Sequence, residues 1–105
     1  IGAVSNTATI FKYNIATNND LVLLEMQGAV GDILSHFYDK DGNIIKTGLN
    51  ERLISSDISM LQNSKKVIGV AGGEDKLAAI HSALVGKFID VFITDEDTAS
   101  KLIDY

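Results

Sequence analysis

Residues 67–103 read VIGVAGGEDKLAAIHSALVGKFIDVFITDEDTASKLI, and this segment is the most informative part of the sequence about the fold. Val67–Ala71 and Phe88–Ile93 are short runs of apolar, largely β-branched residues, which are typical of buried strands. A helical pattern separates these two runs, and another follows them. The order strand, helix, strand, helix predicts a parallel pair of strands joined by a right-handed βαβ crossover, with both faces of the sheet covered.

The helix of this crossover is predicted from its two ends and its apolar spacing. Gly72-Gly73 interrupts the first strand, and Glu74-Asp75 bring negative charge to a first helical turn, where the helix dipole favours it. Gly86 is expected to close the helix. One apolar face is expected to consist of Leu77, Ile80 and Leu84, with Ala83 alongside.

A further helix is expected at the end of the chain. Thr94 and Asp97 resemble a capping box, which marks the start of a helix. The apolar residues at helical spacing that follow are Ala99, Leu102 and Ile103.

The first half of the chain is less regular. Residues 5–19 are polar and are expected to form a loop with local helical turns, and Asp20 is expected to cap a helix that ends at Gly28. The remaining expectations are a strand over Ile33–Tyr38, a turn at Asp41-Gly42, a return strand at Ile44-Ile45 and a short helix over Asp57–Gln62. Ile1-Gly2 resembles the tail of a strand, so we expect the chain to be a fragment.

Composition narrows the class of protein. The 105 residues allow one domain or a piece of a larger one, and the absence of cysteine excludes disulfides, thiolate nucleophiles and cysteine-based zinc sites. The net charge of −5 argues against nucleic-acid binding by this segment. The chain has no apolar run of about 18 residues and no signal-peptide pattern, so no membrane contact and a cytoplasmic location are expected.

Five segments, in their order along the chain, resemble one family. They are Gly28–Ile33 with Phe37 after it, Asp39–Gly42, Leu49–Ile54, Val67–Lys76 and Ile89–Glu96. The chain resembles the C-terminal part of the effector-binding domain of SorC-type sugar-responsive regulators, a group that includes the central glycolytic gene regulators and the deoxyribonucleoside regulators. The resemblance is good over residues 28–104 and loose over residues 1–27.

The resemblance implies both a fold and a function. The fold class is α/β, a Rossmann-like and mostly parallel sheet flanked by helices, similar to glucosamine-phosphate deaminases, ribose-phosphate isomerases and CoA transferases. Residues 1–105 would be the C-terminal portion of the effector-binding domain, and the DNA-binding helix-turn-helix domain would lie outside this chain. The ligand would be a phosphorylated sugar that alters oligomerisation and DNA binding of the whole regulator, which we expect to be a homo-oligomer. No cofactor is implied.

Gly72, Gly73 and Lys76 are the first candidate ligand-binding residues. Glycines at a strand-to-helix turn permit close backbone approach, a helix N-terminus attracts anions, and an ammonium group could reach a phosphate or a sugar oxygen. The alternative is a tight turn followed by a solvated lysine. Spacing alone favours that alternative, whereas the resemblance places Lys76 in the ligand pocket.

Asp32 and Arg52 complete the candidate site. The carboxylate of Asp32 could accept hydrogen bonds from sugar hydroxyls, or it could bond its own turn. The guanidinium of Arg52 could pair with a phosphate, or it could anchor a loop by pairing with an acidic neighbour. Thr94-Asp95 is expected at the same sheet edge as Gly72, where helix capping explains it. His36 and His81 lack metal-ligand spacing and are expected to be structural or exposed.

A binding module is therefore the main interpretation, with no catalytic and no metal-binding residues. Motifs of serine hydrolases and zinc proteases are absent from the sequence. The main alternative is a sugar-phosphate isomerase or deaminase that uses Asp32 as a base and Lys76 as an electrostatic stabiliser. A further alternative is a structural piece that binds no ligand.

Overall fold

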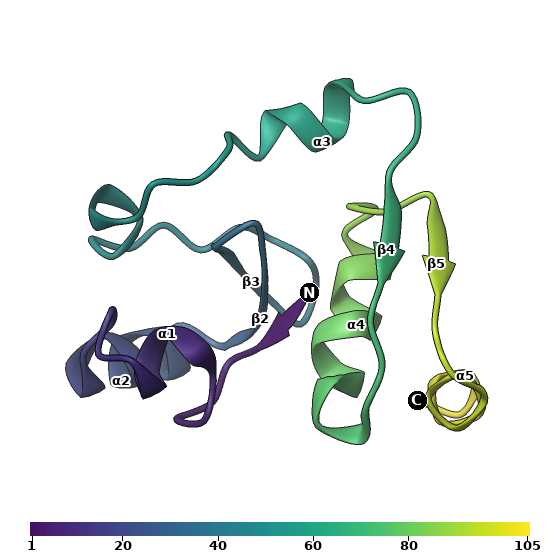
Figure 1. The fold of residues 1–105 in the computed structure, drawn as a ribbon, viewed down its shortest axis with the longest axis horizontal. Helices are drawn as coiled ribbons and strands as arrows, with labels where there is room; N and C mark the ends of the chain where they lie inside the picture. The colour runs from purple at the N-terminus through teal and green to yellow at the C-terminus, as the bar shows by residue number, and fades with distance from the viewer.

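The computed structural model describes residues 1–105, which form two separate sheets. The first sheet is antiparallel and has the order β1-β2-β3, and the second is a parallel pair, β4-β5. Figure 1 shows the two sheets on either side of the N-terminus. The strands are β1 Gly2–Ala3, β2 Ala29–Ile33, β3 His36–Asp39, β4 Ile68–Val70 and β5 Val91–Ile93.

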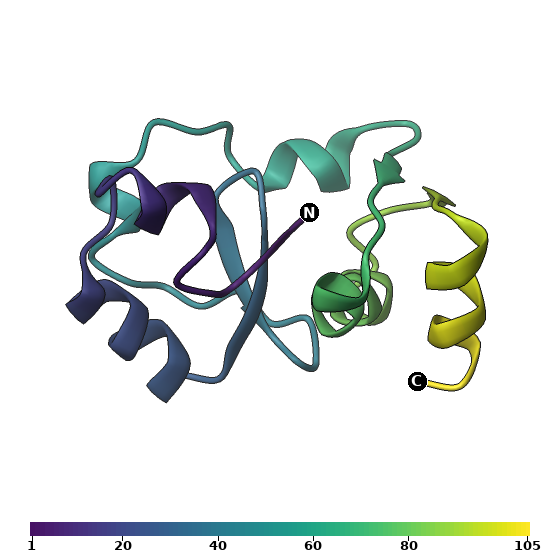
Figure 2. The same ribbon diagram turned by 60° about the horizontal axis from the view of Figure 1, so that its bottom comes forward.

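Five α-helices and two 3-10 turns connect and flank these strands. Figures 1 and 2 show α1 and α2 at one end of the molecule, α5 at the other, and α4 between them. None of the helices is both long and apolar enough to cross a membrane. The helices are α1 Thr9–Lys12, α2 Asn18–Met26, α3 Ser59–Asn63, α4 Leu77–Val85 and α5 Glu96–Ile103, and the 3-10 turns are η1 Asn50–Arg52 and η2 Glu74–Lys76.

The predicted βαβ unit is present as β4, α4 and β5. The two strands run parallel with Gly69 opposite Phe92, and the carboxylate of Asp90 accepts a hydrogen bond of 2.8 Å from the backbone of Val67. The expectation that both faces are covered is wrong for this chain. Because side chains alternate along a strand, Gly69 and Phe92 turn towards the core, while Val70 and Ile93 remain 68% and 52% exposed on the other face.

The coarse α/β class is confirmed, but parallel pairing is confined to β4 and β5. One expectation in the antiparallel part is wrong. Ile33–Tyr38 is not one strand, because the chain reverses at Leu34-Ser35 and β3 pairs back onto β2. Both turn residues have left-handed backbones, with φ 50° and 62°. Two-residue hairpin turns of this kind normally carry Asn or Gly, and that signal is missing here.

The turn at Asp41-Gly42 is confirmed, with Gly42 at φ 79°. The carboxylate of Asp39 accepts backbone hydrogen bonds of 2.9 Å from both Asp41 and Asn43, which closes the loop. The expected return strand is reduced to an isolated antiparallel bridge between Tyr38 and Ile44.

Helix boundaries and faces differ from the expectations in detail. Thr17 caps α2 and Asp20 completes its capping box, so the cap lies earlier than predicted. Asp95, not Thr94, caps α5. Gly86 ends α4 in an ordinary right-handed conformation, and Lys87 takes the left-handed one, with φ 55°.

The buried faces of α4 and α5 also shift. Ile80 and Ala83 are buried as expected, together with Ala79, but Leu84 is exposed. On α5, Thr98 is the buried residue and Ile103 is 84% exposed.

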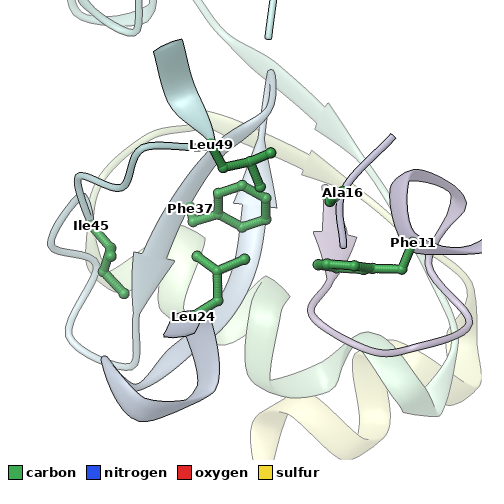
Figure 3. Close-up of a cluster of buried hydrophobic side chains, with 6 residues drawn as sticks. All are labelled: Phe11, Ala16, Leu24, Phe37, Ile45 and Leu49. Atoms are coloured by element: carbon green, nitrogen blue, oxygen red, sulfur yellow. The ribbon is translucent and has the colours of Figure 1, made fainter. Parts of the chain in front are cut away.

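The core consists of two hydrophobic clusters on opposite sides of the β2–β3 hairpin. Figure 3 shows the ring of Phe37 between Leu24 and Leu49 in the first cluster, which also contains Phe11, Ala16 and Ile45. The second cluster contains Ile33, Tyr38, Ala83, Phe88 and Ile89. The hydroxyl of Tyr38 donates a buried 2.8 Å hydrogen bond to the carbonyl of Ala79, which joins β3 to α4.

Candidate functional site

A pocket of about 490 Å³ lies where β1, the segment that follows it, β2 and η2 meet. Two of the predicted site residues line this pocket although they come from different parts of the fold: Asp32 from β2 of the antiparallel sheet, and Lys76 from the η2 turn between β4 and α4. We call it the Asp32–Lys76 pocket. Its lining consists of Ile1, Gly2, Ala3, Ser5, Thr7, Ala8, Thr9, Ile10, Asp32, Asp75 and Lys76.

Asp32 is a partly buried carboxyl on β2, opposite Gly2 of β1. A side chain at Gly2 would collide with the carboxylate of Asp32, so glycine there leaves the space that this carboxylate occupies. Burial raises the pKa of Asp32, because the charged form loses water, while a hydrogen bond from the backbone of Ser35 and the positive charge of Lys76 act in the opposite direction. Asp32 is therefore a hydrogen-bonding group that favours positive charge or hydroxyl donors nearby.

Lys76 ends η2 and takes part in none of the three ion pairs of the structure. Its side chain is partly buried at the pocket wall. A lysine that lines a pocket without a carboxylate partner within ion-pair distance has an ammonium group free for a ligand anion. The pocket therefore combines one free cation with one partly buried carboxyl.

Gly72 and Gly73 lie outside the lining and pack against the start of α5. A side chain at Gly72 would collide with the carboxylate of Asp95, and Gly73 has φ 111°, a conformation that favours glycine. The tight-turn interpretation accounts for both glycines, and a direct contact with a ligand stays a prediction. Thr94-Asp95 lies at the same edge as Gly72, as expected.

Arg52 is not brought to the pocket. Its Nη2 atom donates a 2.6 Å hydrogen bond to Oδ1 of Asp20, at the start of α2. This bond and the positive charge hold the pKa of Asp20 below its usual value. The geometry corresponds to the interpretation in which Arg52 anchors a loop, and a ligand-binding role for Arg52 has no support from its position.

The sequence interpretation missed the hydroxyl groups of the pocket. Ser5, Thr7 and Thr9 all line it, and Ser5 and Thr7 bond each other at 2.9 Å. These residues belong to the polar stretch expected to be a loop. The available signal was their position directly after a strand tail, which is where α/β sheets present polar groups to ligands.

The remaining candidate polar groups have structural explanations. Nε2 of His36 lies 2.8 Å from the carbonyl oxygen of Ser56, and the ring of His81 packs against that of Tyr105 at 5.0 Å. His36 also lines a second pocket of about 340 Å³ over the Ile44–Thr47 segment. No group of three or more His, Cys, Asp or Glu side chains is arranged to hold a metal ion.

Residues 1–104 match the family model described as "Putative sugar-binding domain". The chain is 38% identical over 104 residues to the deoxyribonucleoside regulator of Bacillus subtilis. That alignment covers 99% of this chain and 33% of the regulator, so the chain spans about a third of the length of this relative.

Two solved structures share the fold. A DeoR family transcriptional regulator from Listeria monocytogenes superposes with a TM-score of 0.88 at 29% identity, over 96% of this chain and 41% of that chain. The full-length sorbitol operon regulator SorC from Klebsiella pneumoniae superposes with a TM-score of 0.84 at 28% identity, over 97% of this chain and 32% of that chain.

Proposed function

Because the chain belongs to the sugar-binding domain family found in SorC-type transcriptional regulators, we propose that it senses a phosphorylated sugar through the Asp32–Lys76 pocket. The observation that carries this proposal is the convergence of Asp32 on β2 and Lys76 on the η2 turn, which are far apart in the sequence, on one pocket. The volume of about 490 Å³ lies within the range of small-molecule sites.

The charges of the pocket suggest how such a ligand would lie. Lys76 would hold the phosphate, because an ammonium group forms strong charge-assisted hydrogen bonds with anionic oxygens. Asp32 would repel a phosphate and accept hydrogen bonds from sugar hydroxyls instead. Ser5, Thr7 and Thr9 can donate to either part of the ligand. A neutral sugar would leave Lys76 unpaired, so a phosphorylated sugar fits better.

In the whole protein, ligand binding would regulate transcription by stabilising one assembly of the regulator. The net charge of −5 argues against DNA binding by this chain itself. We therefore propose that a helix-turn-helix domain outside this chain binds DNA, and that the chain is the C-terminal portion of a larger effector-binding domain. We further propose a homo-oligomer in the cytoplasm. We also propose that the whole domain is similar in fold to sugar-phosphate isomerases, deaminases and CoA transferases. Contacts of Gly72, Gly73 and Arg52 with the ligand remain predictions.

The enzyme alternative receives no support. The relative and the two structures described above are all named as regulators.

The test is a thermal-shift and calorimetric screen of the purified protein against phosphorylated sugars, with their unphosphorylated forms alongside. A ligand of the native state raises the melting temperature as its concentration rises. Lys76→Ala should weaken binding by about tenfold or more, because a hydrogen bond to a charged group contributes about 1.5–3 kcal/mol. Lys65→Ala, which removes an exposed lysine outside the pocket, is the matched control. Binding that is unchanged in Lys76→Ala, or no binding of any phosphorylated sugar, would contradict the proposal.

A further inference from the structure

Thr98 lies outside the pocket on α5 and is nonetheless almost completely buried, with 1% of its surface exposed. It is a polar residue that directly follows the charged start of the helix, Asp95–Asp97. A buried hydroxyl is costly unless its hydrogen bonds are satisfied. The partners of this hydroxyl therefore show what Thr98 holds in place.

The hydroxyl of Thr98 has a fixed direction in a short hydrogen-bond chain. Its oxygen lies 2.8 Å from Oδ2 of Asp95 and 2.9 Å from the backbone nitrogen of Gly73. Hydrogen bonds hold the pKa of Asp95 low, so its carboxylate only accepts, and the amide of Gly73 only donates. The hydroxyl must therefore donate to Asp95 and accept from Gly73.

The same glycine is bonded to Lys76. The backbone N–H of Lys76 donates a 3.1 Å hydrogen bond to the carbonyl of Gly73, which closes the η2 turn. Hydrogen bonds thus run without a break from Asp95 through Thr98 and Gly73 to the backbone of Lys76. The turn needs such a support, because glycine at φ 111° has little intrinsic preference for one conformation.

A second contact between η2 and α5 is much weaker. Nζ of Lys101 lies 3.0 Å from the carboxylate of Glu74, but it is shared with Asp97, and both carboxylates are well exposed. Exposed ion pairs of this kind contribute little and are screened by salt. The buried hydroxyl of Thr98 is therefore the principal link between the two elements.

We propose that Thr98 is a positioning residue for ligand binding, which holds Lys76 against the Asp32–Lys76 pocket through the Gly72–Gly73 turn. The inference rests on the proposed function. It assigns to α5, which does not line the pocket, an indirect influence on ligand affinity through the Gly72–Gly73 turn.

The test compares Thr98→Val, which keeps the shape and removes the hydroxyl, with Thr98→Ser, which keeps the hydroxyl. Calorimetry with the phosphorylated sugar identified by the screen should show binding weakened about tenfold in Thr98→Val and within about twofold of wild type in Thr98→Ser. In a Lys76→Ala background, Thr98→Val should have no further effect, because both changes remove the same contact. If Thr98→Val fails to fold, Thr98→Ala takes its place.

A measurement without ligand separates this inference from the proposed function. Amide hydrogen exchange at Gly73 should be faster in Thr98→Val and unchanged in Thr98→Ser. The pKa of Asp32, followed by NMR, should rise in Thr98→Val as the charge of Lys76 moves away. Failure of the wild type to bind any phosphorylated sugar would overturn the proposed function alone. Three results would overturn the positioning role. The first is an exchange rate at Gly73 in Thr98→Val equal to that of the wild type. The others are equal losses of ligand affinity in Thr98→Val and Thr98→Ser, or affinity losses of Thr98→Val and Lys76→Ala that add up in the double variant.

Discussion

The β2–β3 hairpin and the β4–β5 pair differ in how many of their faces are covered. On the hairpin, Phe37 belongs to one hydrophobic cluster and Tyr38 to the other, and both are almost completely buried. On the parallel pair, Val70 and Ile93 are more than half exposed. The hairpin is thus an inner wall between two clusters, whereas the parallel pair is covered on one face only. The length of an apolar run does not predict how deeply a strand is buried in this protein, because the longer apolar runs belong to β4 and β5, the more exposed strands.

This difference matters for the pocket. Asp32 belongs to the hairpin and Lys76 to the parallel unit, so their separation depends on how the two regions pack. The packing element is α4, which lies against β2 and receives the hydrogen bond of Tyr38. Disturbing this contact should damage stability and ligand binding together.

The largest expected effect comes from Gly31→Ala, which breaks the contact between the two regions. A Cβ atom at Gly31 would lie 2.5 Å from Cβ of Ala79 and 2.7 Å from the hydroxyl of Tyr38. Overpacking of this kind should lower the free energy of unfolding by about 3 kcal/mol, measured by urea denaturation. Gly48→Ala is the control, since a Cβ atom there meets no atom within 4 Å and should change stability by less than about 0.5 kcal/mol. Equal stabilities of the two variants would show that α4 does not pack closely on β2.

The same comparison explains which parts of the fold could be predicted. Val67–Ala71 and Phe88–Ile93 are recognisable because composition and spacing alone identify a βαβ unit. The hairpin turn at Leu34-Ser35 could not be found, because its left-handed conformations are imposed by the burial of β2 and β3 and not by turn-forming residues. The exposure of Val70 could not be predicted either, because an apolar strand sequence does not indicate whether one face of the strand is covered or both.

The residues of the candidate site also differ in how far the sequence alone could predict their positions. The spacing around Lys76 alone favoured a solvated lysine, and it was the family resemblance that predicted a pocket position. In the structure Lys76 lines the Asp32–Lys76 pocket, and its contact with a ligand stays a prediction. The pairing of Arg52 with Asp20 joins two distant segments, and no local pattern indicates it. The approach of Ser5 and Thr7 to Lys76 is also tertiary, since it arises only once β1 pairs with β2.

A smaller effect is expected from Arg52→Ala, which sharpens the comparison by testing a contact within the first region. Its ion pair with Asp20 is partly exposed, so its loss should cost only about 0.5 kcal/mol after solvent screening. Because the pKa of Asp20 is lowered in the folded protein, the contribution is present at neutral pH and is lost as the pH falls below 3.8. Denaturation curves of the variant and wild type should therefore differ at pH 7 and converge in acid. Ligand affinity should be unchanged, and a loss of affinity would return Arg52 to the binding site.

The smallest effect is expected from Val70→Thr, on the open face of β4. Because this side chain is 68% exposed, replacing a methyl group with a hydroxyl should change the free energy of unfolding by less than about 0.5 kcal/mol. Val67→Thr, directly before the same strand, is the matched change at a residue packed against the second cluster, and it should cost about 1–2 kcal/mol because its hydroxyl is desolvated. Chemical denaturation at several protein concentrations measures both. If Val70→Thr were as destabilising as Val67→Thr, the outer face of β4 and β5 would be covered in solution. Both sheets would then be covered on two faces, and they would differ only in what covers them.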